Sequence, residues 1–253
     1  MNSYQKPNFF NSIPPVTSNI LIINAIVWLA SLALARFNID LSSILGIHYF
    51  QSSEFRVFQI ITYMFTHVNF MHIFFNMFAV YMFGMVLERR WRSKRFLTYY
   101  LVTGIGAGLI QMLVYYLRIN SLLGSGELPF DALAVVHGQG HDLLMNGMNF
   151  TGKLGELNVL YNGVTIGASG SVFGILLAFG MLYPNAELML MFIPIPIKAK
   201  YFVVGYGAIE LFLGFANFGW DNIAHFAHLG GMLFGFFMML YWKRKDKKNV
   251  RFF

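Results

Sequence analysis

The chain has no cysteine and unusually little charge. Of its 253 residues, 11% are charged and 57% are hydrophobic, whereas soluble domains carry about 25% charged residues. The missing cysteines exclude disulfides, thiolate zinc sites and a cysteine nucleophile, although they do not identify a compartment. The shortage of charge argues against an ordinary soluble domain and indicates a membrane protein.

Several sequence patterns are missing as well. Residues 1–18 are polar and lack the charged, apolar and cleavage regions of a secretory signal peptide. The chain has no His-Glu-x-x-His, which disfavours metalloprotease chemistry, and no apolar run carries a central Asp, which disfavours an aspartyl mechanism. His137 and His141, followed by Asp142, form a single helix-spaced pair, so we predict no metal site and no cofactor.

The chain does contain six apolar runs, each close to the roughly 20 residues that a helix needs to cross a bilayer. They are residues 19–35, 67–87, 96–117, 166–183, 201–218 and 222–242. We therefore expect an all-α, polytopic membrane bundle of six transmembrane helices. Residues 1–18 would form an N-terminal tail, 19–242 the six-helix domain and 243–253 a basic tail.

Two segments between these runs are too polar to span a bilayer and too apolar for a free loop. We expect residues 36–58 to lie in the membrane interface. Residues 118–164, rich in Gly and Asn, form a long insertion between the third and fourth spans. We expect short helices there, on the outer membrane surface or against the core. This insertion either packs only or borders the path by which substrates enter.

The distribution of cations predicts the orientation. Lys and Arg collect in cytoplasmic loops, and an inner N-terminus places 14 of the 18 Lys and Arg residues on the cytoplasmic side. We therefore expect both termini in the cytoplasm and the chain in the cell membrane. A net charge of +7 would favour nucleic acid in a soluble protein, but in so apolar a chain we predict no nucleic-acid partner.

This topology brings three polar clusters to one depth. The second, fourth and sixth spans run from outside to inside, so His72, Ser169 and His228 lie about 5–9 Å below the outer boundary. Taken alone, a membrane serine is usually a packing residue, and a lone histidine can be a satisfied interhelical hydrogen bond. Three such residues at one depth indicate a functional site.

The motifs around these residues resemble the rhomboid family of intramembrane serine proteases. They are Gly167-Ala168-Ser169-Gly170, the run from His228-Leu229-Gly230-Gly231 to Gly235, and His72-Ile73-Phe74-Phe75-Asn76. The resemblance implies a Ser–His dyad without an acidic third member. It gives Ser169 the role of nucleophile and His228 that of general base, with His72, Asn76 and the Ser169 backbone amide stabilising the oxyanion.

The resemblance also assigns supporting roles. Gly167 and Gly170 surround the serine, and Gly231 and Gly235 form the small-residue motif that follows the family's catalytic histidine, which selects His228 over His225. Phe173 matches an aromatic position that packs against the base. Phe55, between Glu54 and Arg56, departs from the Trp-Arg loop motif that the family carries at this place.

The expected function is therefore an intramembrane serine endopeptidase that cleaves transmembrane segments of membrane proteins. Its partners would be transmembrane substrates and the lipid bilayer, and the sequence predicts no particular oligomeric state. Two alternatives stay open. One is a catalytically silent relative that acts as a membrane-protein chaperone, and the other is a haem-binding membrane protein, because helix histidines can be axial ligands.

Overall fold

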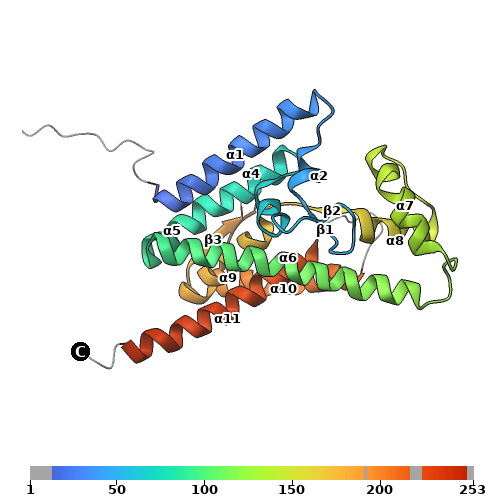
Figure 1. Cartoon of the computed structure of the whole chain (residues 1–253). Helices are drawn as coiled ribbons and strands as arrows, with labels where there is room; N and C mark the ends of the chain where they lie inside the picture. The colour runs from blue at the N-terminus through green and yellow to red at the C-terminus, as the bar shows by residue number, and fades with distance from the viewer. Residues whose placement is uncertain (1–12, 191–192, 217–223, 250–253) are drawn as a thin grey trace, which may run out of the picture.

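The computed structural model describes residues 13–190, 193–216 and 224–249, and most of these are helical (Figure 1). In chain order the elements are α1 (Pro15–Ala35), α2 (Leu41–Leu45), β1 (Ile47–His48), α3 (Gln59–Thr62), the 3₁₀ turn η2 (Tyr63–Phe65), α4 (Phe70–Ala79), the π-helical turn η3 (Val80–Gly84), α5 (Met85–Trp91), α6 (Ser93–Leu123), α7 (Ala132–Met145), α8 (Gly152–Asn162), β2 (Val164–Thr165), α9 (Ser169–Leu182), β3 (Glu187–Leu190), β4 (Ile193–Lys198), α10 (Ala199–Ala216) and α11 (His225–Asn249).

The predicted helical bundle of a membrane protein is confirmed. In the part of the chain that the structure describes, four helical segments are long and apolar enough to cross a membrane, namely Pro15–Ala35, Phe70–Trp91, Ser93–Leu123 and Ala199–Ala216. The fourth and sixth predicted runs correspond to α9, which has only 14 residues, and to α11. That the chain crosses the membrane six times therefore stays a prediction.

The centre of the bundle is formed by α6, α9 and α11, which lie side by side (Figure 1). Small residues allow this close packing: an added β-carbon at Gly106 of α6 would clash with the Phe234 ring of α11. Buried hydroxyl groups connect α6 to α9. Tyr99 Oη donates to the Gly174 carbonyl at 2.8 Å, and Ser171 Oγ donates to the Tyr100 carbonyl at 2.8 Å. These contacts fix the depth of α9 in the bundle.

The first helix begins inside the segment that was predicted to be a tail. α1 starts at Pro15, which is favoured at the first helical position because its missing N–H needs no partner there. The buried carboxylate of Glu88 accepts hydrogen bonds from the Val16 N–H at 2.9 Å and from the Thr17 N–H at 2.7 Å. Glu88 therefore caps α1 from the end of another helical segment.

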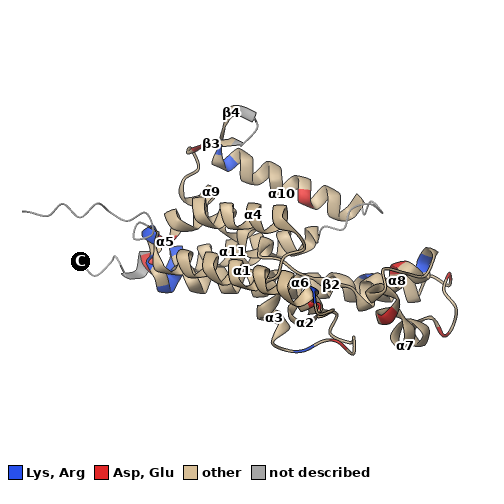
Figure 2. Ribbon diagram, turned by 90° about the horizontal axis from the view of Figure 1, so that it is seen from above, with Lys and Arg blue, Asp and Glu red and all other residues tan. Residues whose placement is uncertain are grey.

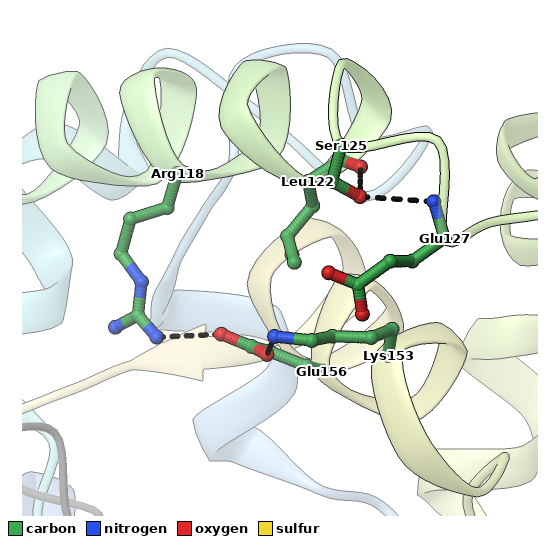
Figure 3. Close-up of polar contacts among 6 residues, drawn as sticks. All are labelled: Arg118, Leu122, Ser125, Glu127, Lys153 and Glu156. Carbon is green, nitrogen blue, oxygen red and sulfur yellow. Dashed lines mark hydrogen bonds and ion pairs between the residues drawn. The ribbon is translucent and has the colours of Figure 1, made fainter.

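The insertion contains two short helices, α7 and α8, as expected. With Tyr49 and the end of α6 they enclose a second apolar core that includes Ile119, Leu157 and Leu160. α6 runs to Leu123, beyond the predicted end of the third span, because this core covers its last turns. Figure 3 shows the polar contacts alongside: Arg118 Nη2 lies 2.9 Å from a Glu156 oxygen, and Lys153 Nζ lies 3.6 Å from the other.

Two short antiparallel strand pairings among the described residues were not predicted. β1 pairs with β2 in antiparallel register, with Ile47 opposite Thr165, so residues 36–58 are joined to the segment that leads into α9. β3 pairs with β4 beyond the opposite end of α9. The first pairing joins segments that are distant in the chain, and the second includes a strand that contains Pro194 and Pro196, so local sequence patterns predict neither.

Cationic residues gather at the α5 end of the bundle and along the end of α11 (Figure 2). Arg95 connects the two regions, because its guanidinium lies 2.9 Å from an Asp246 oxygen and 4.2 Å from the centroid of the Trp242 ring. The two basic runs that were predicted to share the inner face therefore do lie together. Their placement on the cytoplasmic side stays a prediction.

Candidate active site

Ser169 is the first residue of α9, directly after a tight turn. Gly167 has φ +126°, a conformation that residues with a β-carbon rarely adopt, and its N–H donates to the Tyr63 carbonyl at 2.9 Å. The first N–H groups of a helix have no partner within that helix. The turn therefore presents the Ser169 hydroxyl beside backbone donors at the positive end of the α9 dipole.

The structure brings Ser169 and His228 together from positions 59 residues apart. His228 Nε2 lies 2.8 Å from Ser169 Oγ, which is hydrogen-bond distance. α9 and α11 can approach this closely because an added β-carbon at Gly231 would clash with the Gly170 carbonyl oxygen. Gly235 packs instead against the Tyr99 hydroxyl of α6. The two predicted glycines of α11 therefore contact different helices.

Phe173 packs on the imidazole ring of His228, as expected. The two rings are stacked with centroids 4.2 Å apart and an angle of 8° between their planes. Tyr206 of α10 stacks on Phe173, at 5.1 Å and 8°. The aromatic ring therefore restricts the orientation of His228 and links it to α10.

A third side chain contacts His228, and sequence reasoning missed it. Glu210 of α10 places Oε2 2.9 Å from Nδ1 of His228 and 2.6 Å from Nδ1 of His225. All three side chains are buried, with at most 8% of each residue exposed. The resemblance implied a dyad with no acidic third member, whereas here a carboxylate lies at hydrogen-bond distance from the expected base.

The sequence did contain a signal for Glu210. It is an acidic residue in the interior of the apolar run 201–218, and ionisable residues inside membrane helices usually mark a functional site. The absence of a central Asp from the apolar runs does not extend to Glu, and Glu210 is the acid that lies inside this one. Glu210, His225 and His228 also place their ligand atoms within 4.8 Å of one another, close enough to share a metal ion, although no metal site was predicted.

His72 and Asn76 lie on α4, whose first turn is capped by Asn69. The Val68 N–H donates to His72 Nδ1 at 3.4 Å, which leaves Nε2 to carry the ring proton. The same edge of the ring faces the turn before Ser169, because an added β-carbon at Gly167 would lie 2.8 Å from His72 Nε2. Asn76 is buried, and its Nδ2 donates to the His72 carbonyl at 2.9 Å, which leaves its second amide hydrogen for another acceptor.

Phe55, in place of the tryptophan of the family motif, packs its partly buried ring against the larger apolar core, which includes Met64 and Ile175. Arg56 Nη1 donates to the Ser53 carbonyl at 2.6 Å and to the Phe55 carbonyl at 2.9 Å. The loop is therefore ordered by the arginine and its own backbone.

Comparison with known proteins agrees with these motifs. A family model described as the Rhomboid domain matches residues 54–245. The chain is 24% identical over 171 residues to "Rhomboid protein 1, mitochondrial" of Saccharomyces cerevisiae, an alignment that covers 68% of this chain and 38% of that protein. It is 30% identical over 146 residues to "Rhomboid-like protease 1" of Toxoplasma gondii (53% and 49%). It is 22% identical over 227 residues to "Rhomboid-like protein 16, chloroplastic" of Arabidopsis thaliana (89% and 62%). The chain therefore spans less than two thirds of the length of each of these relatives.

Proposed function

The chain belongs to the rhomboid family, and from this membership we propose that it is an intramembrane serine endopeptidase that cleaves transmembrane segments of membrane proteins. The observation that carries the proposal is the 2.8 Å distance between Ser169 Oγ and His228 Nε2. A hydroxyl at this distance from an imidazole nitrogen can transfer its proton as it attacks a carbonyl carbon.

In the first step, His228 Nε2 takes the proton of Ser169 while Oγ bonds to the carbonyl carbon of the scissile peptide. The carbonyl π electrons move to oxygen and form a tetrahedral oxyanion. His228 then returns the proton to the leaving nitrogen as the C–N bond breaks. Water repeats the sequence on the acyl enzyme, with His228 again as base, and restores the Ser169 hydroxyl.

The oxyanion is stabilised by donors that are in place before the reaction. The Ser169 backbone N–H, the Nε2–H of His72 and the free Nδ2–H of Asn76 are the donors that we assign to it. A donor of this kind contributes about 3 kcal/mol to transition-state stabilisation in a site that excludes water. Phe173 supports the reaction by fixing the His228 ring.

Neither alternative function is favoured by a specific contact. His228 is not available as a haem ligand, because iron needs a free histidine nitrogen and both ring nitrogens of His228 lie within 2.9 Å of a hydrogen-bond partner. A silent chaperone-like relative would not need a serine and a histidine at 2.8 Å. Enzymatic measurement separates the three functions.

The test uses purified protein in proteoliposomes with single-pass membrane substrates and a fluorophosphonate probe. We expect the probe to label Ser169 and the wild type to cleave within a transmembrane segment. Ser169→Ala and His228→Ala should abolish cleavage while retaining the fold. Ser31→Ala is the matched control, because Ser31 Oγ only donates to the Val27 carbonyl of its own helix at 2.9 Å. A wild type that is not labelled and cleaves nothing would contradict the proposal.

We further propose that the protein lies in the cell membrane with both termini in the cytoplasm. The apolar helices support membrane insertion, and the gathered cations support the orientation. Because the chain has no cysteine, single cysteines can be introduced at positions 153 and 247 without background. A membrane-impermeant maleimide applied to intact cells should label only the first, and labelling of only the second would reverse the orientation.

A further inference from the structure

We propose that Glu210 positions His228 and stabilises its protonated form, so that Ser169, His228 and Glu210 act as a triad. The inference rests on the proposed endopeptidase function. Its basis is geometric: Glu210 Oε2 lies 2.9 Å from Nδ1 of His228, while Ser169 Oγ lies 2.8 Å from Nε2 of the same ring. The carboxylate and the serine hydroxyl therefore lie at hydrogen-bond distance from the two different nitrogens of one imidazole.

The carboxylate determines which nitrogen of His228 carries the proton. An ionised carboxylate only accepts hydrogen bonds, so Nδ1 must be the N–H that donates to Glu210. Nε2 then has a free lone pair, which can accept the proton of Ser169. Without Glu210 the neutral ring could hold its proton on Nε2, where it cannot act as a base.

The burial of Glu210 makes its charge most effective during the reaction. A buried carboxylate is costly unless it is paired, and here only about 5% of the residue is exposed. When His228 takes the serine proton, the resulting imidazolium and the carboxylate form a pair of zero net charge. The interaction is therefore stronger in the transition state than in the resting enzyme, which is the condition for a gain in kcat.

Glu210 adds no proton transfer to the reaction described above. Ser169 loses its proton to His228 Nε2 as the Oγ–C bond forms, and the same proton leaves on the amine product. Glu210 stays ionised throughout and accepts the Nδ1–H bond in every step. It is a positioning residue, because it acts on the substrate only through His228.

His225 is part of the same arrangement. It lies three residues before His228, on the same face of α11, and its Nδ1 lies 2.6 Å from the same Glu210 oxygen. A second donor to Oε2 restricts the rotation of the carboxylate. Among the residues that the structure describes, the other titratable groups at this cluster are His72 of α4, near His228, and Tyr206 of α10, near Glu210 and stacked on the Phe173 ring that covers His228.

Two other roles are consistent with the same contacts and are tested together with this one. Glu210 could serve only as a mechanical tether between α10 and α11, or it could hold a metal ion with the two histidines. A tether requires an acceptor oxygen at this position and no charge. A metal site requires that removal of the ion changes the activity.

The decisive variant is Glu210→Gln, which keeps the size and an acceptor oxygen but removes the charge. We expect kcat to fall by about 10²–10⁴-fold with KM little changed. The acidic limb of the pH–rate profile should move to lower pH, because a carboxylate no longer stabilises the protonated ring. Glu210→Asp keeps the charge, so its profile should stay near that of the wild type even where its kcat is lower. Glu187→Gln is the same change at an exposed position of β3, beyond the other end of α9. It should leave kcat and the pH–rate profile unchanged.

The outcomes are distinguishable. An active wild type with a Glu210→Gln variant of equal kcat and equal pH profile would overturn the triad, and lower thermal stability without a change in pH profile would show a tether. Loss of wild-type activity on chelation, restored by Zn²⁺ alone, would overturn it in favour of a metal site. A wild type that neither labels at Ser169 nor cleaves would overturn the proposed function itself.

If the variants do not fold, ¹⁵N-histidine NMR of the wild type replaces them. A protonated Nδ1 on His228 supports the triad, and a proton on Nε2 overturns it.

Discussion

Gly231 of α11 lies directly against the carbonyl oxygen of Gly170 in α9, with no room for a β-carbon between the two backbones. This contact is one residue from Ser169 and less than one helical turn from His228. The separation of the two helices at this point therefore controls the distance from Ser169 Oγ to His228 Nε2.

The first prediction follows from this contact. Gly231→Ala should push α11 away from α9 and lengthen the distance from Ser169 Oγ to His228 Nε2. A displacement of about 1 Å in a catalytic arrangement costs about 10²-fold in rate, so we expect a loss of that order in kcat. Gly205→Ala on α10 is the control, because nothing lies within 4 Å of an added β-carbon there. Equal activity of the two variants would contradict the prediction.

The second prediction concerns the oxyanion donors. Donors that strengthen only as negative charge develops affect turnover more than substrate binding. We therefore expect His72→Ala and Asn76→Ala each to lower kcat by about ten- to a thousand-fold while KM changes little. Steady-state kinetics on a single-pass substrate in proteoliposomes measures both constants. A rise in KM alone would mean that these residues bind substrate instead.

The third prediction separates the two histidines of α11. His228→Ala should be inactive, because it removes the base. His225→Ala should keep substantial activity, because the Glu210 oxygen still lies 2.9 Å from His228 Nδ1 when its second donor is lost. Cleavage rates of the two variants, with circular dichroism to confirm folding, provide the comparison. An inactive His225→Ala beside an active His228→Ala would reverse the assignment.

The side chains whose proximity could be predicted from the sequence were those that two independent patterns indicated. Ser169, His228 and His72 lie in local motifs, and the expected topology also brought them to one depth, so their proximity could be predicted. Glu210 has no motif around it, and its role depends on the rotation of α10 about its own axis, which burial and packing determine. The pairing of β1 with β2 depends on long-range register, and the capping of α1 by Glu88 joins residues 71 apart. Such contacts need three-dimensional packing to become visible.

The fourth prediction concerns that cap. The Glu88 carboxylate accepts from the Val16 N–H, from the Thr17 N–H and hydroxyl, and from the Ser93 hydroxyl at 2.7 Å, and the residue is only 2% exposed. Hydrogen bonds to a charged group contribute about 1.5–3 kcal/mol each. Glu88→Ala should therefore lower the thermal midpoint in detergent, because several donors lose their acceptor. Glu187→Ala, at an exposed position, should leave the thermal midpoint unchanged. The kcat of the folded fraction should be normal in both variants.

The last prediction concerns the insertion of residues 118–164. Its apolar core contains Tyr49, the end of α6, α7 and α8, and no residue of α9 or α11 belongs to that core among those the structure describes. Removing α7 should therefore leave the distance between Ser169 and His228 unchanged.

The test replaces residues 124–155 by a Gly/Ser linker. It measures labelling by a small serine-reactive probe together with cleavage of several transmembrane substrates. Because Phe130, Met145 and Met148 are exposed on this insertion, we expect it to contact some substrates before they reach the site. Labelling should persist while cleavage of some substrates falls, and the single change Phe130→Ser should weaken the same substrates to a smaller extent. Uniform retention of every activity would assign the insertion a packing role only, and loss of probe labelling would show that it supports the site itself.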